Sequence, residues 1–137
     1  MRIVFDTNVI IDAIAAREPF CMAAQKLLLL VSEEKLEGYL TANSVTDVYY
    51  VTRRSHTEAE AKEIIRSLLH SLEIIAVDGA DCWQALGLPM SDFEDALIAA
   101  CAEKIEADYI VSRDVAFAEA NTTVKVIEPV ALLEKIV

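Results

Sequence analysis

Glycine and proline are scarce in this sequence, with three of each among 137 residues. This scarcity argues against a flexible linker or a low-complexity segment, so we expect one domain over residues 1–137. The longest strictly aliphatic run, Leu27-Leu28-Leu29-Leu30-Val31, is far too short to cross a bilayer. The N-terminus also lacks the basic, apolar and cleavage-site pattern of a signal peptide. We therefore expect a cytoplasmic protein that does not engage a membrane.

Cysteines and basic residues are also few. The three cysteines are Cys21, Cys82 and Cys101; they are far apart and lie among apolar residues, which favours buried free thiols over disulfides or a zinc site. Only 12 lysines and arginines stand against 23 aspartates and glutamates, giving a formal net charge of −11. This balance argues against a protein that coats nucleic acid by charge alone, because such binding depends on lysine and arginine side chains that neutralise phosphates. An enzyme that holds phosphates through metal ions remains compatible with it.

Apolar residues are abundant, at 55% of the chain, and they fall into alternating strand and helix patterns. Strands alternating with helices predict a three-layer α/β/α sandwich with a central, mostly parallel five-stranded sheet. The predicted strands are residues 2–6, 36–40, 73–77, 109–111 and 124–127. The predicted helices are residues 8–16, 19–34, 44–52, 57–72, 80–86, 91–106, 114–119 and a last helix from residue 129.

The first predicted strand runs directly into an acid. Ile3, Val4 and Phe5 lead to Asp6, and helical spacing begins soon after it. In an open α/β sheet, ligands bind in the crevice outside the carboxyl ends of the strands. A carboxylate there stays ionised only if positive charge or hydrogen bonds compensate it. Asp6 is therefore a candidate ligand residue, although a helix N-cap would do the same local job.

Four further aspartates fall at comparable places. Asp47 lies one turn inside the helix after the second strand, and Asp114 follows the fourth strand. Asp92 and Asp95 lie three apart on one face of the helix before that strand. Strand ends and the starts of the following helices crowd onto one edge of a parallel sheet. We therefore expect these acids to converge with Asp6.

Crowded carboxylates repel one another unless protonation or cations relieve the repulsion. Hard divalent cations such as Mg²⁺ take oxygen ligands, usually one or two carboxylates completed by waters and substrate phosphates. Two such ions can activate a water and stabilise the leaving oxygen of a phosphodiester. The absence of histidine and cysteine from the set argues against zinc. The pattern predicts a metal-dependent nuclease.

Taken singly, most of these acids also have a structural interpretation. Asp6, Asp92 and Asp114 suit helix N-termini, and Asp47 lies three residues after Ser44, where it could complete a capping box. Asp95 is the exception. It lies beyond the predicted capping box Ser91-x-x-Glu94 and directly before the apolar stretch 96–100, so it needs a partner.

Four sequence blocks together resemble the PIN domain family. They are Phe5-Asp6-Thr7-Asn8-Val9, Ser44-Val45-Thr46-Asp47, Asp92-Phe93-Glu94-Asp95-Ala96-Leu97-Ile98-Ala99-Ala100 and Val111-Ser112-Arg113-Asp114-x-x-Phe117. The resemblance implies a compact α/β/α fold and Mg²⁺- or Mn²⁺-dependent cleavage of RNA. Many small members are VapC-type toxins of bacterial and archaeal toxin–antitoxin pairs. It therefore also implies a cognate antitoxin protein as partner and a homodimer.

The resemblance assigns roles to individual residues. Asp6, Asp95 and Asp114 match the metal-binding carboxylates, with Asp92 as an extra ligand. Asp47 is the remaining catalytic acid, but the family usually has the longer Glu there. An aspartate would act through a water or need a closer backbone. The supporting residues are Asn8, through its amide, and Ser112.

Two other function classes stay open. A haloacid-dehalogenase-type phosphotransfer enzyme also begins with a strand-end Asp. That class has an acid at the position of Asn8 and a downstream lysine near the phosphate, so Asn8 counts against it. A non-catalytic PIN-like binding module would keep the fold and have lost activity at Asp47. Arg113, between Ser112 and Asp114, could steady a phosphate or pair with an acid.

Overall fold

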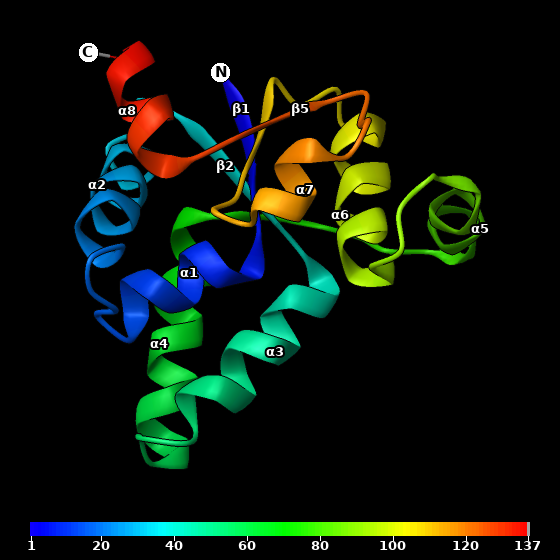
Figure 1. Ribbon diagram of the computed structural model, residues 1–137. Helices are drawn as coiled ribbons and strands as arrows, with labels where there is room; N and C mark the ends of the chain where they lie inside the picture. Colours follow the sequence, from blue (N-terminus) through cyan, green and yellow to red (C-terminus); the bar gives the residue numbers. More distant parts are fainter. Residues whose placement is uncertain (137) are drawn as a thin grey trace.

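The computed structural model describes residues 1–136, and it confirms the α/β/α sandwich (Figure 1). The strands are β1 (Arg2–Phe5), β2 (Glu37–Thr41), β3 (Glu73–Ile75), β4 (Tyr109–Val111) and β5 (Lys125–Ile127). The helices are α1 (Thr7–Ile14), α2 (Cys21–Ser32), α3 (Ala42–Thr52), α4 (Glu58–Ser71), α5 (Gly79–Gly87), α6 (Phe93–Lys104), α7 (Val115–Glu119) and α8 (Pro129–Ile136). Residue 137, the last of the predicted domain, lies outside the described residues.

The sheet is parallel throughout, in the order β3-β2-β1-β4-β5, as the sequence predicts. Phe5 at the end of β1 pairs with Val111 at the end of β4. The next residues, Asp6 and Ser112, therefore leave the sheet at the same level. This register places the residues after β1 and β4 next to each other, although more than a hundred positions separate them in sequence.

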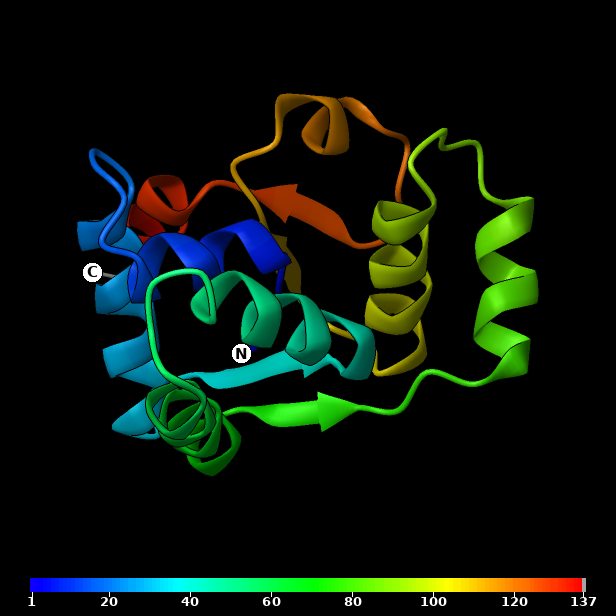
Figure 2. The same ribbon diagram turned by 90° about the horizontal axis from the view of Figure 1, so that it is seen from below.

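Side-chain alternation along β1 divides the core between the two faces of the sheet. Ile3 and Phe5 pack with α1, α2, α3, α4 and α8, whereas Val4 packs with α6 and α7. All three side chains are fully buried. Figure 2 shows α6 against the sheet, with α5 on the far side of α6.

Helix α6 is buried on all sides over eight consecutive residues, from Asp95 to Ala102. It lies between the sheet on one side and α5 on the other, so no face of this segment meets solvent. A helix that is apolar all round is typical of such a position. The small residues of the alanine-rich stretch thus pack in two directions, and Asp95 begins this buried segment.

Two predicted helix caps are wrong. Helix α3 begins at Ala42 with Thr41 as its N-cap, so Ser44 lies inside the helix, fully buried, and cannot form a capping box with Asp47. Helix α6 is capped by Asp92, whose Oδ1 accepts a hydrogen bond of 3.1 Å from the Asp95 backbone amide. The structure therefore removes the capping-box interpretation of Asp47.

Other boundaries differ by small amounts. The predicted capping box at Thr57 and Glu60 is confirmed, while a second box, at Asp78 and Asp81, opens α5 and was missed. β2 lies one residue later than predicted, and β3 ends at Ile75. None of the helices among residues 1–136 is long and apolar enough to span a membrane.

Candidate functional site

Asp6 is the buried centre of the candidate site. It follows β1 directly, and only 5% of its surface is exposed. Its Oδ2 accepts hydrogen bonds from Ser112 Oγ at 2.6 Å and from Asn8 Nδ2 at 3.1 Å. Burial raises the pKa of Asp6 and the charge of Asp114 adds to this, while the Ser112 hydroxyl and the backbone amides of Thr7 and Asn8 act in the opposite direction. Asn8 and Ser112 therefore lie where the sequence predicted supporting residues.

Ser112 connects two of the predicted acids. Its hydroxyl donates to Asp6 and accepts a hydrogen bond of 3.1 Å from the Asp114 backbone amide. Asp114 Oδ1 in turn accepts from the Ala116 backbone amide at 2.9 Å and caps α7. Asp114 is thus both the N-cap of α7 and a candidate site residue. The cap uses Oδ1 and does not involve Oδ2.

Asp95 shows most directly that the acids converge. It is 9% exposed, and its pKa is raised to about 7. Burial is the largest cause, and the negative charges of neighbouring carboxylates add to it. These neighbours are Asp6, Asp92, Asp114 and Glu94. Three of the four are predicted site residues, brought together from β1, the start of α6 and the β4–α7 loop.

Glu94 is a site residue that sequence reasoning missed. Its Oε1 accepts a hydrogen bond of 3.2 Å from the Thr7 hydroxyl. The Thr7 and Ser44 hydroxyls are 2.8 Å apart, and Ser44 is also 2.8 Å from the Thr41 hydroxyl. Buried hydroxyls thus run from the end of β2 to the Glu94 carboxylate. The sequence signal for Glu94 was its position directly before Asp95. The predicted capping box Ser91-x-x-Glu94 gave it a structural role instead.

Asp47 lies at the outer edge of this cluster. Its side chain is exposed on α3. The pKa of Glu94 is raised, first by partial burial and then by the negative charges of Asp47, Asp6 and Asp92. A hydrogen bond from Thr7 opposes this rise. Asp47 is therefore close enough for its charge to act on Glu94, and its own side chain is exposed to solvent.

Within residues 1–136, no basic side chain forms an ion pair with an acid of the cluster. The ion pairs there connect other residues, and Arg113, the nearest arginine in sequence, pairs with Asp12. In the part of the chain that the structure describes, no group of three or more carboxylate, imidazole or thiol side chains is arranged so that it could hold a metal ion by itself. Mg²⁺ needs only one or two protein carboxylates, with waters and phosphates completing its coordination. A set of carboxylate oxygens without ion-paired basic side chains among residues 1–136, some with raised pKa values, fits such a cation.

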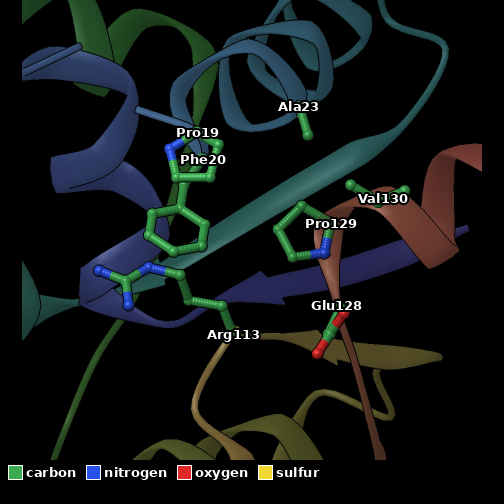
Figure 3. A pocket seen from close by; sticks show the side chains of 7 residues that line it. All are labelled: Pro19, Phe20, Ala23, Arg113, Glu128, Pro129 and Val130. Carbon is green, nitrogen blue, oxygen red and sulfur yellow. The ribbon is translucent and has the colours of Figure 1, made fainter. Parts of the chain in front are cut away.

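A separate pocket of about 320 Å³ lies between the start of α2 and the start of α8 (Figure 3). Its walls are mostly apolar, and none of the site acids lines it. It meets the acidic cluster only through Arg113, the neighbour of Asp114. The lining residues are Pro19, Phe20, Ala23, Arg113, Glu128, Pro129 and Val130.

The sequence model of the PIN domain matches residues 2–116, which include all of the acids of the candidate site. The chain belongs to the PIN domain family. Among the curated proteins, none matches this sequence at a significant level. Membership of the PIN family argues against the haloacid-dehalogenase alternative.

Solved structures share this fold at low sequence identity. VapBC2 from Rickettsia felis, solved with a DNA fragment from its promoter, is 17% identical with a TM-score of 0.70 and covers 93% of this chain and 98% of its own. VapC20 from Mycobacterium tuberculosis, a toxin that cleaves the sarcin–ricin loop, is 16% identical with a TM-score of 0.69 over 88% and 96%. FitAcB from Neisseria gonorrhoeae is 22% identical with a TM-score of 0.63 over 93% and 97%. These likenesses show the PIN fold.

Proposed function

We propose that this PIN domain is a Mg²⁺- or Mn²⁺-dependent endoribonuclease that hydrolyses RNA phosphodiester bonds. One observation carries the proposal: carboxylates from three parts of the chain meet at the carboxyl edge of a parallel sheet, no basic side chain among residues 1–136 forms an ion pair with them, and Asp95 has a pKa of about 7 among them. Such a cluster favours a divalent cation, because the cation removes the repulsion that burial makes costly.

Each acid then has a distinct task. Asp6, Asp95 and Asp114 would hold the cation, with Asp92 at the start of α6 as an extra ligand. When bound, the cation supplies an activated water and offsets charge on the leaving oxygen. Ser112 and Asn8 orient Asp6 by donating to its Oδ2.

Asp47 and Glu94 form the solvent-facing side of the site. Thr7 holds Oε1 of Glu94, and burial together with the charge of Asp47 raises the pKa of Glu94. A carboxylate with a raised pKa accepts a proton more readily near neutral pH. In this proposal the pair would orient an attacking water and receive its proton, and Glu94 would provide the longer side chain that position 47 lacks.

The biological setting follows from the same family. Structural neighbours from VapBC toxin–antitoxin complexes support a role as the toxin of such a pair. A cognate antitoxin protein would neutralise the enzyme in the cytoplasm, and the toxin would act as a homodimer. A small neighbouring reading frame that encodes a DNA-binding protein would support this setting.

The test is cleavage of an RNA pool by the purified protein with Mn²⁺, with Mg²⁺ and with a chelator, followed by mapping of the new ends. We expect cuts at defined positions that need the cation. Asp6→Asn keeps the side-chain shape and removes the charge, so it should abolish these cuts while leaving the circular dichroism spectrum unchanged. Intact RNA in every reaction, with a folded protein, would instead favour the non-catalytic binding module.

A further inference from the structure

Asp12 is a buried acid that the proposed chemistry does not use. It lies on α1 and is only 1% exposed, inside a helix whose neighbouring residues Ile10, Ile11 and Ala13 are buried core residues. A buried carboxylate is costly unless a charged or hydrogen-bonding partner compensates it. Its partner is Arg113.

The Arg113 guanidinium binds Asp12 through two of its nitrogens. Nε is 2.6 Å from Asp12 Oδ2, and Nη2 is 3.1 Å from Oδ1. The face of the guanidinium lies against the Phe20 ring, with Cζ 4.2 Å from the ring centroid (Figure 3). A two-point bond between a planar fork and a carboxylate fixes direction as well as distance. Of the two roles considered for Arg113, pairing with an acid is therefore the one the structure shows.

The pair joins the two chain segments that carry the site acids. Asp12 belongs to the β1–α1 unit, in which Asp6 is the N-cap of α1. Arg113 belongs to the three-residue loop between β4 and α7, where its direct neighbours are Ser112 and Asp114. Ser112 makes a second connection between the same segments through Asp6. Two of the three loop residues, Ser112 and Arg113, are thus attached to the β1–α1 unit.

These attachments act against electrostatic repulsion. The negative charges of Asp6 and Asp114 repel each other, and within residues 1–136 neither carboxylate takes part in an ion pair. This repulsion favours separation of the two carboxylates, and the attachments of the β4–α7 loop oppose it. The charge of Arg113 also lies close enough to Asp6 and Asp114 for them to raise its pKa.

We propose that Asp12 and Arg113 are positioning residues that hold the Asp114 carboxylate beside Asp6, so that the cation site is formed before the cation arrives. This inference rests on the proposed function. Phe20 supports the arrangement by covering one face of the guanidinium. The role differs from phosphate binding, because Nε and Nη2 are committed to Asp12.

The test uses the paired variant Asp12→Leu/Arg113→Met. Removing both charges together avoids leaving one of them buried alone, and apolar replacements for a buried ion pair often preserve stability. Mn²⁺ affinity is measured by calorimetry, alongside RNA cleavage as a function of Mn²⁺ concentration. We expect Mn²⁺ affinity to fall by ~10-fold or more, as for losses of groups that orient metal ligands. The cleavage rate at saturating Mn²⁺ should return close to that of the wild type.

The matched control is Asp81→Asn/Lys104→Met. Asp81 is also a buried acid, 2.6 Å from Lys104, but this pair joins α5 to the C-terminal end of α6, while the site acids lie at the other end. In the wild type, the Asp78 backbone amide donates a hydrogen bond to Asp81 Oδ2. The Asn replacement keeps a side-chain oxygen that can accept this bond. The control should leave Mn²⁺ affinity per folded molecule unchanged.

The outcomes separate the two proposals. Equal Mn²⁺ affinity in the wild type and in a folded Asp12→Leu/Arg113→Met variant overturns the positioning role while leaving the ribonuclease proposal standing. Equal loss in the control variant also overturns it, since any buried ion pair would then have the same effect. A wild-type protein that binds no Mn²⁺ overturns the proposed function itself. If the paired variant does not fold, Arg113→Lys keeps the charge but loses the two-point bond, and it should show the same fall in affinity.

Discussion

Ser112 Oγ donates a hydrogen bond of 2.6 Å to Asp6 Oδ2 across two strand ends, linking residues 106 positions apart in sequence. The hydroxyl lowers the pKa of Asp6 against the opposing effect of burial. Ser112 therefore helps to keep the Asp6 carboxylate ionised and oriented. Removing the hydroxyl would also remove the bond that it accepts from the Asp114 backbone amide.

Ser112→Ala should raise the pKa of Asp6 further and weaken cation binding. We expect Mn²⁺ affinity to fall by roughly 10-fold, and the rising limb of the cleavage pH profile to move to higher pH. Ser32→Ala is a suitable control, because that exposed hydroxyl bonds only a carbonyl within α2. An unchanged pH profile in Ser112→Ala would remove the hydroxyl from the mechanism.

Asp95 should make stability depend on pH in an unusual direction. Its pKa is about 7 in the folded protein against an ordinary value of 3.8, so the folded state binds more protons between these values. Without a divalent cation, the stability that Asp95 contributes is present at low pH and is lost as the pH rises through about 7. The melting temperature of Asp95→Asn should therefore gain on the wild type as the pH rises from 4 to 8. A constant difference across that range would contradict the raised pKa.

Divalent cations should reverse this dependence. Cation binding requires deprotonated carboxylates, so Mn²⁺ affinity should increase with pH until Asp95 is fully ionised, above about 7. Mn²⁺ should then raise the melting temperature of the wild type more at pH 8 than at pH 5, and should have little effect on Asp95→Asn. An equal shift at both pH values would place the cation elsewhere.

Asp47 and Glu94 can be separated by their substitutions. Asp47→Glu should keep or improve cleavage, because the longer side chain restores the usual reach of the family. Asp47→Ala should slow cleavage steeply, and Glu94→Gln should do so as well if both act on one water. An Asp47→Ala protein with lowered stability but an unchanged specific rate would assign Asp47 to the scaffold.

Gly38 allows a prediction about stability alone. A Cβ built at this position of β2 would lie 2.8 Å from Leu72 Cδ2 and 2.8 Å from Val31 Cγ2. The stiff valine cannot move aside cheaply, so Gly38→Ala should destabilise the fold by about 1–3 kcal/mol, as overpacked cores do. Chemical denaturation measures this cost. Gly87→Ala, where a Cβ would meet nothing within 4 Å, should not incur it.

Much of the fold could be predicted because its information is local. Apolar runs give the strands, their alternation with helices gives a parallel sheet, and the strand-end acids then fall on one edge. Helix starts were less accessible. Ser44 is a residue type that often caps helices, but here it is buried inside α3 in contact with Thr7. No local sequence pattern reveals that contact.

Only part of the candidate site could be predicted, because some of its members meet through contacts between residues far apart in sequence. Asp6, Asp95 and Asp114 stand at positions that topology brings together, whereas Glu94 joins them through Thr7, a contact across 87 residues. The Asp12–Arg113 pair spans 101 residues. A lone acid within an apolar helix gives no sign of its partner until the sheet order is known.

The most direct test of the central claim is anomalous X-ray diffraction from crystals of the wild-type protein soaked in Mn²⁺. We expect an anomalous peak from a Mn²⁺ ion bound by carboxylates of the cluster, with Asp6 and at least one of Asp95 and Asp114 among its ligands. The peak should be absent from crystals of Asp6→Asn grown and soaked in the same way. A protein that cleaves RNA in the presence of Mn²⁺ but binds the ion away from these three residues would contradict the account.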